Sequence, residues 1–186
     1  GIWASRHTRE IAKAIAERLA AIRPLPPDHP DALLAAFTVP GAAASIAKAI
    51  DGDAALPGVT DMSAAHRDGS RHVTLGRANY LLPTVLHCDS HESAAAQREY
   101  MFPFVSVVHC EQAKMADAIG PTLVCTVLSD DERFRQQLLD SIHIDRLNFG
   151  PVATTALNWL QPHEGNIVDF LFRARAFQFD KAMIKV

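Results

Sequence analysis

Three cysteines and nine histidines are the side chains here that could act as nucleophiles, bases or metal ligands. Two cysteines directly follow a histidine, in His87-Cys88 and His109-Cys110. Neighbours in a strand point to opposite faces, so neither pair is a ready nucleophile–base dyad. Cys125 lies within an apolar run, where a cysteine is typically a small buried hydrophobic residue. The sequence therefore predicts structural cysteines and assigns no catalytic residue to this chain.

Motifs for metals and phosphates are also missing. No Cys-x-x-Cys occurs, and His163-Glu164 lacks the second histidine of a zinc-binding helix. Neither Gly-x-Gly-x-x-Gly nor Gly-x-x-x-x-Gly-Lys occurs, so the sequence shows no loop of a known phosphate-binding type. We expect no metal site, and we expect any dinucleotide to be held mainly by residues outside this chain.

Glu99 stands where α/β proteins often bind ligands. It precedes Tyr100-Met-Phe-Pro103 and the apolar run Phe104–Val108, which predicts a loop at one end of a sheet strand. A carboxylate there can accept hydrogen bonds from both hydroxyls of a ribose. The alternative, which residue type alone would favour, is an exposed acid at a helix end with no particular role.

The composition is that of one ordinary globular domain. The chain has 186 residues, 48% of them hydrophobic and 21% charged, with a net charge of −3. No cluster of Lys and Arg interleaved with aromatic residues occurs, so nucleic-acid binding is unsupported. No apolar run is long enough to cross a membrane, and the scattered, odd-numbered cysteines favour a reducing cytoplasm. The chain opens without Met in strand-like sequence, so we expect a portion of a longer protein.

The order of the expected elements indicates an α/β fold. Apolar residues at helical spacing predict a helix from His7 to Ile22 with Thr8 as its N-cap. A small-residue helix over 42–50 ends at Asp51-Gly52. The runs 104–108 and 122–128 are continuously apolar, as in strands of a parallel sheet covered on both faces. Further strands are expected at 2–5, 71–77 and 144–149, and further helices at 111–118, 130–141 and 163–173. We predict an open, mainly parallel sheet flanked by helices, in a single domain over residues 1–186.

Two consecutive segments resemble signatures of the NAD(P)-dependent aldehyde dehydrogenases. Gly76-Arg-Ala-Asn-Tyr-Leu-Leu-Pro-Thr-Val-Leu86 is similar to the family's "G-x-[YF]-x-x-P-T-[VL]-[LV]" strand. Arg98-Glu-Tyr-Met-Phe-Pro-Phe104 is similar to the acid-acid-x-F-G-P-V loop that follows it. Weaker similarity covers nearly the whole chain, including Thr122–Asp131 and the Arg146-Leu-Asn-Phe149 strand. The resemblance implies the catalytic-domain portion of such an enzyme, with its cysteine nucleophile upstream of Gly1.

The resemblance also implies site residues. Glu99 would bind the nicotinamide ribose of NAD or NADP, with Met101 beside the nicotinamide. Ala153 and Trp159 would line the tunnel for a small-molecule aldehyde, preferably an apolar or aromatic one. Three departures stand out: Arg98 replaces the first acid, Met101 the phenylalanine, and Phe102 the glycine. Bulk at Phe102 could narrow the nicotinamide site or change how the loop turns.

Three readings of the function remain open from the sequence. The first is an aldehyde dehydrogenase that works through a cysteine thioester. The second is an acylating or acyl-reducing relative with the same chemistry, and the third is a pseudoenzyme or assembly module. The end of the chain, residues 177–186, alternates without a cleanly apolar face, as an edge strand does. The resemblance implies that this strand joins a partner's sheet in a homodimer or tetramer; a frayed tail is the alternative.

Overall fold

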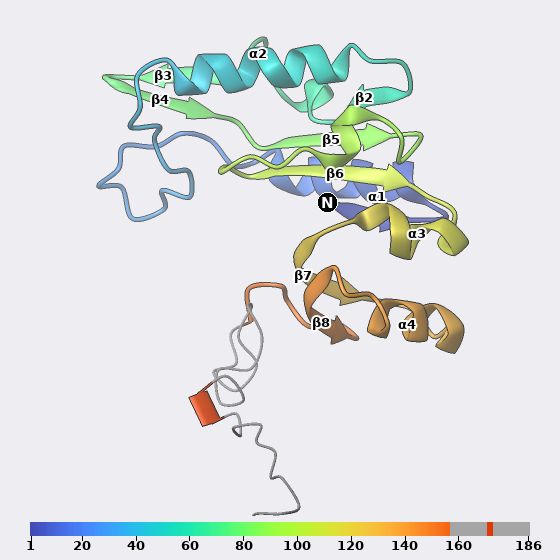
Figure 1. Ribbon diagram of the computed structural model, residues 1–186. Coiled ribbons are helices and arrows are strands. Elements are labelled where there is room, and N and C mark those ends of the chain that lie inside the picture. Colours follow the sequence, from blue (N-terminus) through green and yellow to red (C-terminus); the bar gives the residue numbers. More distant parts are fainter. Residues whose placement is uncertain (157–170, 173–186) are drawn as a thin grey trace, which may run out of the picture. The chain divides into compact units, whose positions relative to one another are not determined.

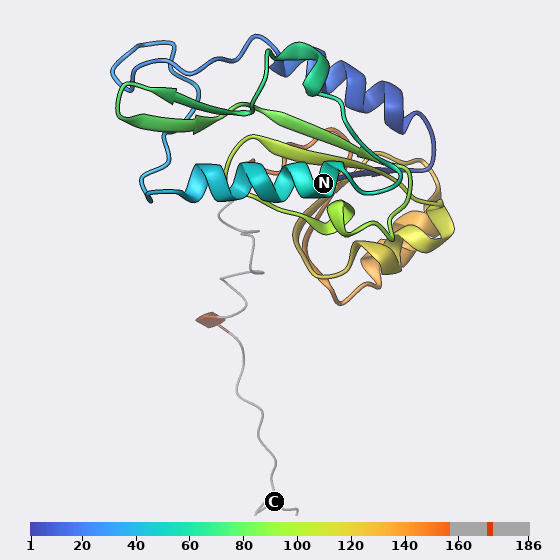
Figure 2. The same ribbon diagram turned by 90° about the horizontal axis from the view of Figure 1, so that it is seen from above.

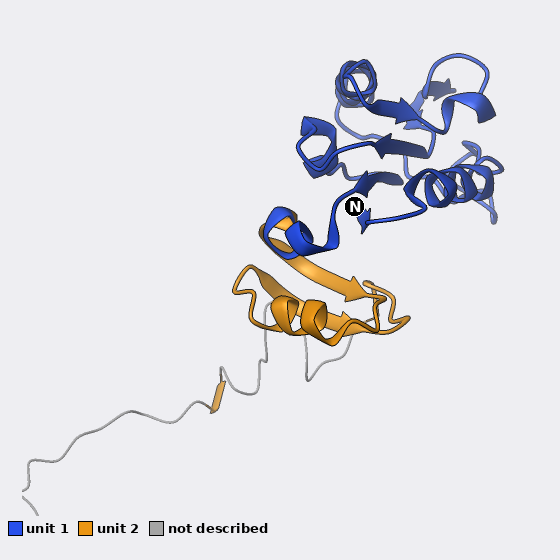
Figure 3. Ribbon diagram, turned by 90° about the vertical axis from the view of Figure 1, so that its right-hand side faces the viewer, with its two compact units in different colours: residues 1–118 blue, residues 119–186 orange. Residues whose placement is uncertain are grey.

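The computed structural model describes residues 1–156 and 171–172, in two compact units, Gly1–Ala118 and Ile119–Val186 (Figure 3). Each unit is described by itself below. The expected single domain over 1–186 stays a prediction. The expected strand over 177–186 lies outside the described residues, as does most of the helix expected over 163–173.

The first unit is built on a four-stranded sheet in the order β1-β6-β5-β2 (Figure 1). Three of its strands are parallel, so the predicted mainly parallel α/β fold is confirmed. Only β2 runs antiparallel, beside β5. The strands are β1 (Ile2–Ala4), β2 (Val59–Asp61), β5 (Thr84–Cys88) and β6 (Phe104–His109).

Two helices cover opposite faces of this sheet (Figure 2). On one face α1 (Thr8–Leu19) packs Ala12 and Ala16 against Val85 and Val107. On the other face α2 (Ala42–Ala54) packs against the residues next in line on the same strands, Leu86 and Val108. Successive residues of a strand point to opposite faces, and all five residues of β5 are buried. The apolar core therefore fixes both helices on the sheet.

The connections contain shorter elements. A hairpin of β3 (His72–Leu75) and β4 (Ala78–Leu81) turns at Gly76, whose φ of 62° favours glycine. The 3-10 helices η1 (Ala64–His66) and η2 (Ala94–Gln97) precede the hairpin and β6. Helix α3 (Gln112–Ile119) follows β6. No helix among the described residues is long and apolar enough to cross a membrane.

The second unit is a β-α-β arrangement. Strands β7 (Thr122–Val127) and β8 (Ile144–Phe149) pair in parallel, and α4 (Glu132–Leu139) connects them. Asp131 caps α4, because its carboxylate accepts hydrogen bonds from the backbone N–H groups of Arg133 and Phe134 at 2.9 and 3.1 Å. The unit thus follows the expected order of strand, helix and strand.

The structure corrects three expectations about these elements. The N-cap of α1 is His7, in a left-handed conformation with φ 60°, because the Thr8 hydroxyl is committed to His87 instead. Helix α2 continues through Asp51-Gly52 to Ala54, because its buried face includes Ile50 and Asp53. Strand β7 is not covered on both faces: Leu123 is 49% exposed.

Candidate functional site

Glu99 lies on a loop at one end of a sheet strand, as the sequence predicted, and that end is the amino end of β6, not the carboxyl end at which α/β sheets usually bind ligands. The loop, residues 98–103, runs from η2 to β6. Its last residue is fixed to the sheet, since the Thr84 N–H donates to the Pro103 carbonyl at 3.0 Å. The side chain of Glu99 is exposed. No described residue forms a hydrogen bond or ion pair with its carboxylate, so both oxygens are open to a ligand.

The beginning of β1 lies toward the same end of the sheet as this loop. β1 runs parallel to β6, with Ile2 opposite Val107. From Ile2 back to Gly1 the chain therefore runs toward the amino half of β6, which is the end at which the Glu99 loop enters the strand.

The residues on either side of Glu99 share one buried partner that the sequence did not reveal. Arg98 Nε lies 3.1 Å from Asp53 Oδ2, and the Tyr100 hydroxyl lies 3.5 Å from the same oxygen. Asp53 is in the last turn of α2 and is only 5% exposed. Its carboxylate therefore ties the Glu99 loop to α2. Asp53 and Arg98 are 45 positions apart in the sequence, so no local pattern indicates this contact.

The other two departures from the family loop, Met101 and Phe102, have different surroundings. The Phe102 ring packs among other aromatic rings, with centroid distances of 6.2 Å to Tyr100 and 6.0 Å to Phe104. Phe102 therefore contributes to the core at the base of the loop. Met101 is 94% exposed and contacts no apolar cluster in the described residues. The expectation that Met101 lies beside a nicotinamide stays a prediction.

The cysteines have the surroundings of structural residues. Cys88 is fully buried, and burial together with Asp53 and Asp89 raises the pKa of its thiol to about 11. Burial also raises the thiol pKa of Cys110 and of Cys125. Thiols with raised pKa values stay protonated at neutral pH and are poor nucleophiles. None of these three cysteines is placed to replace the nucleophile that the resemblance puts upstream.

His87 points away from Cys88, which confirms the prediction that the pair forms no dyad. Its Nε2 lies 2.9 Å from the Thr8 hydroxyl on the α1 face, whereas Cys88 belongs to the cluster on the α2 face. His87 Nδ1 lies 3.3 Å from Asp89 Oδ1. His91 follows four residues later, but residues 87–91 are strand and turn, not helix, so the two are not a helical ligand pair. The described residues include no group of three potential metal ligands.

Ala153 belongs to the second unit, in the loop after β8. Two hydrogen bonds of the Arg146 guanidinium hold this loop, to the carbonyls of Thr154 and Ala156, both at 2.8 Å. Asn148 donates to the Thr126 hydroxyl at 3.1 Å, and that hydroxyl donates to the Val152 carbonyl at 2.9 Å. Ala153 itself is exposed. Trp159 lies outside the described residues, so neither substrate residue is tested.

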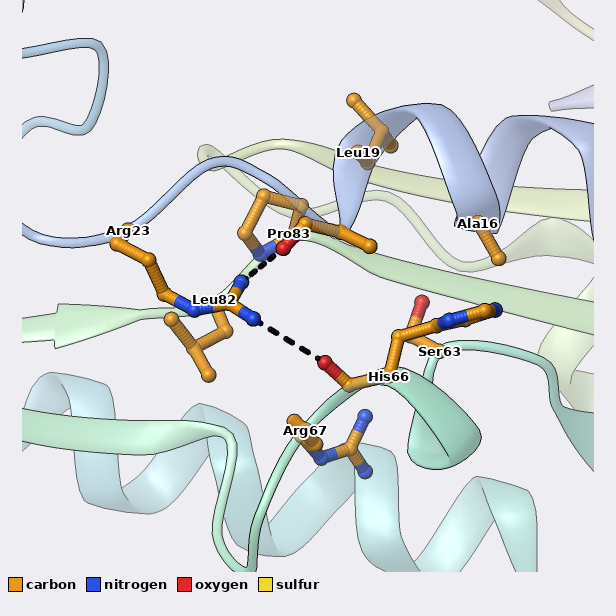
Figure 4. Close-up of a pocket in the computed structure, with 9 residues that line it drawn as sticks. Ala16, Leu19, Arg23, Ser63, His66, Arg67, Leu82 and Pro83 are labelled. Atoms are coloured by element: carbon orange, nitrogen blue, oxygen red, sulfur yellow. Dashed lines mark hydrogen bonds between the residues drawn. The ribbon is translucent and has the colours of Figure 1, made fainter.

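A pocket in the first unit is not a substrate site (Figure 4). It lies between the end of α1, the segment around His66, and Leu82-Pro83. Its volume is about 10 Å³, roughly the room that one water molecule needs. The Arg23 guanidinium crosses it and donates to the His66 carbonyl at 3.3 Å. The pocket is lined by Ala16, Leu19, Ala20, Arg23, Ser63, His66, Arg67, Leu82 and Pro83.

Comparison with solved structures shows which fold this is. An aldehyde dehydrogenase from Bacillus cereus matches 77% of the chain with a TM-score of 0.60 and 11% identity. The fold is similar to that of the aldehyde dehydrogenases. Betaine aldehyde dehydrogenase from Staphylococcus aureus, solved with NAD+, matches 86% of the chain with a TM-score of 0.63 and 15% identity. An NAD-dependent benzaldehyde dehydrogenase from Corynebacterium glutamicum matches 78%, with a TM-score of 0.53 and 19% identity.

The match extends over only a part of these enzymes. The chain covers 28%, 33% and 30% of the three solved chains, in the order given above. At these identities the similarity establishes the fold and leaves activity open. No protein-family model matches the chain, and no curated protein sequence matches it significantly.

Proposed function

We infer that the protein containing this chain oxidises an aldehyde with NAD or NADP, and that Glu99 binds the nicotinamide ribose. The observation that carries this inference is the position of Glu99. In a fold similar to that of the aldehyde dehydrogenases, an exposed carboxylate lies on the loop before β6, at the end of the sheet from which the parallel strand β1 starts. The sequence resemblance assigns the cofactor contact to this same residue.

The Glu99 carboxylate suits the ribose part of the cofactor, and Met101 would lie beside the nicotinamide. Two carboxylate oxygens can accept from the two adjacent hydroxyls of a ribose, and charge strengthens such hydrogen bonds. The sequence contains no glycine-rich phosphate-binding loop, so residues outside the chain would hold the phosphates. When bound, NAD or NADP accepts a hydride from the substrate. The role of Glu99 is to orient the ribose and, through it, the attached nicotinamide ring.

The direction of β1 supports a nucleophile outside this chain. Because β1 is parallel to β6, residues before Gly1 would run beside Val105 and Phe104, toward the Glu99 loop. A cysteine thiolate there would attack the aldehyde carbon; once that carbon has given up its hydride to NAD or NADP, water or another acceptor would release the thiolate from the thioester. The three cysteines of this chain, with their raised thiol pKa values, do not compete for this role.

Substrate, assembly and location are finer parts of the proposal. Ala153 and Trp159 would give the tunnel room beside a large apolar wall, which suits an apolar or aromatic aldehyde. Residues 177–186 would add a strand to the sheet of a second copy in a homodimer or tetramer. A reducing cytoplasm is the proposed location, because all three cysteines are free thiols.

The formation of NADH or NADPH from a series of aldehydes tests the activity. We expect the complete protein to produce it and the 186-residue chain alone to produce none, because this chain holds neither nucleophile nor phosphate-binding loop. Formation of a thioester product only when coenzyme A is added would favour the acylating relative. Production by the chain alone, or none by the complete protein, would contradict the proposal, and the latter would favour the assembly module.

A further inference from the structure

One buried carboxylate contacts both chain neighbours of Glu99. Asp53 accepts from Arg98 through two nitrogens, Nε at 3.1 Å and Nη2 at 3.5 Å. The Tyr100 hydroxyl lies 3.5 Å from Asp53 Oδ2. Asp53 is 5% exposed, whereas the side chain of Arg98 is half exposed. A buried carboxylate with these partners is a fixed point to which the loop is attached.

The two contacts explain how Asp53 affects Glu99. The side chains of Arg98 and Tyr100 both reach Asp53, so both lie on the α2 side of the loop. Glu99 stands between them in the chain and is exposed. Their attachment therefore turns the Glu99 carboxylate outward, in agreement with its exposure.

The Tyr100 ring secures the same side of the loop. It packs edge-on against Phe104, with 4.9 Å between the ring centroids. Burial of the phenol, and then the negative charge of Asp53, raises the pKa of Tyr100. The phenol therefore stays protonated and keeps its hydrogen for donation to Asp53.

The charge of Asp53 has a second effect on Glu99. Arg98 is the cation next to Glu99 in the chain, and an arginine without another partner can pair with a neighbouring carboxylate in a bidentate way. Such a pair would occupy the oxygens that a ribose needs. The Arg98–Asp53 pair keeps the guanidinium on the α2 side of the loop.

We propose that Asp53 is a positioning residue for the cofactor site. It holds Arg98 and Tyr100 against α2, and thereby keeps the carboxylate of Glu99 turned outward and available to the nicotinamide ribose. This proposal rests on the proposed role of Glu99. It assigns a function to the α2 carboxylate and to the arginine that stands in place of the first acid of the family loop.

A double-mutant cycle in the complete protein tests the proposal. The variants are Asp53→Asn, Glu99→Gln and both together, and the readouts are the dissociation constants of NADH and NADPH. We expect Asp53→Asn to weaken binding of the preferred nucleotide about tenfold, the effect of losing one charge-assisted hydrogen bond. Asp53 acts through Glu99, so the double variant should bind no more weakly than Glu99→Gln alone.

Hydrogen–deuterium exchange of residues 98–103 provides a readout that needs no cofactor. Asp53→Asn should speed exchange in this loop while leaving β5 protected. Arg98→Gln should also speed exchange in this loop. It breaks the Arg98–Asp53 pair by changing the exposed partner, so it disturbs folding less than a change of the buried Asp53. Asp51→Asn is the matched control, because Asp51 lies on the same helix but pairs with Arg71, at 2.7 Å, away from Glu99.

The outcomes separate the two proposals. If Glu99→Gln weakens binding but Asp53→Asn does not, or if the two effects multiply in the double variant, the role of Asp53 is wrong and that of Glu99 stands. Unchanged exchange of residues 98–103 in both Asp53→Asn and Arg98→Gln would also overturn the role of Asp53. If Glu99→Gln leaves binding unchanged, the role of Glu99 fails and that of Asp53 falls with it.

Discussion

For single residues, the sequence predicted a role where neighbouring residues define the site, and it failed where the partner is distant in the sequence. Glu99 could be selected from the sequence because the elements around it placed it at a strand end. Asp53 could not be selected, because its partner Arg98 is 45 residues away and only the fold brings them together. The sequence predicts Thr8 as an N-cap, which is wrong for the same reason: the partner of its hydroxyl, His87, is 79 positions away.

His87 leads to a prediction about pH. Burial lowers its pKa from 6.5, as do the charges of Arg9 and His109, while Asp89 and Glu10 act in the opposite direction. The folded protein therefore favours the neutral imidazole, and below pH 6.5 the unfolded chain binds the proton more readily. The stability that His87 contributes is present above pH 6.5 and is lost as the pH falls toward the lowered pKa of the folded state.

The measurement is urea unfolding between about pH 7.5 and 5.5, around the ordinary histidine pKa, for the parent and for His87→Gln. Glutamine keeps a group that can accept from Thr8 and does not titrate. We expect the free energy of unfolding of the parent to fall more steeply with decreasing pH than that of the variant. The other histidines titrate in both proteins and affect both curves equally. Parallel curves of unfolding free energy against pH would therefore show that His87 does not contribute to the pH dependence.

At the scale of elements, the sequence located the larger helices and strands and the short strand β1, but not the short strand β2. The strand over 144–149 and the helix beginning at Ala42 agree with the sequence, because their patterns are local. The three-residue strand β2 was missed, since Val59–Asp61 has no recognisable pattern of its own. It forms because β5 offers an edge and because Asp61 pairs with Arg67 and Arg71.

Arg71 is predicted to be the main charged link among these elements. It is 2% exposed and contacts Asp51 on α2, Asp61 on β2 and Thr84 on β5, at 2.7, 2.9 and 3.1 Å. Arg71→Met should lower the free energy of unfolding by about 3 kcal/mol, because a partly buried carboxylate loses a partner. Denaturant unfolding measures this loss.

Arg9→Met is the matched control. The Arg9–Asp89 pair is 3.6 Å apart with both side chains more than half exposed, and such pairs contribute less than about 1 kcal/mol. If Arg71→Met costs no more than Arg9→Met, the buried network does not hold the elements together.

At the scale of the whole molecule, the chain supplies one part of the expected machinery. It covers about a third or less of the solved enzymes it resembles. The open α/β fold could be predicted because alternating strands and helices follow general rules. The division into two compact units could not be predicted, because the sequence shows no linker between them.

The central claim is that Glu99 orients the cofactor for hydride transfer. Its most direct test is the rate of hydride transfer in a single turnover of the complete protein, measured with an aldehyde carrying hydrogen or deuterium on its carbonyl carbon. Glu99→Gln keeps the shape of the side chain and removes its charge, so we predict a rate lower by about 10- to 100-fold and a larger isotope effect on turnover. Glu92→Gln, an exposed acid before η2, should match the parent. A Glu99→Gln variant that folds normally and transfers the hydride at the parent's rate, with the parent's isotope effect, would contradict the account.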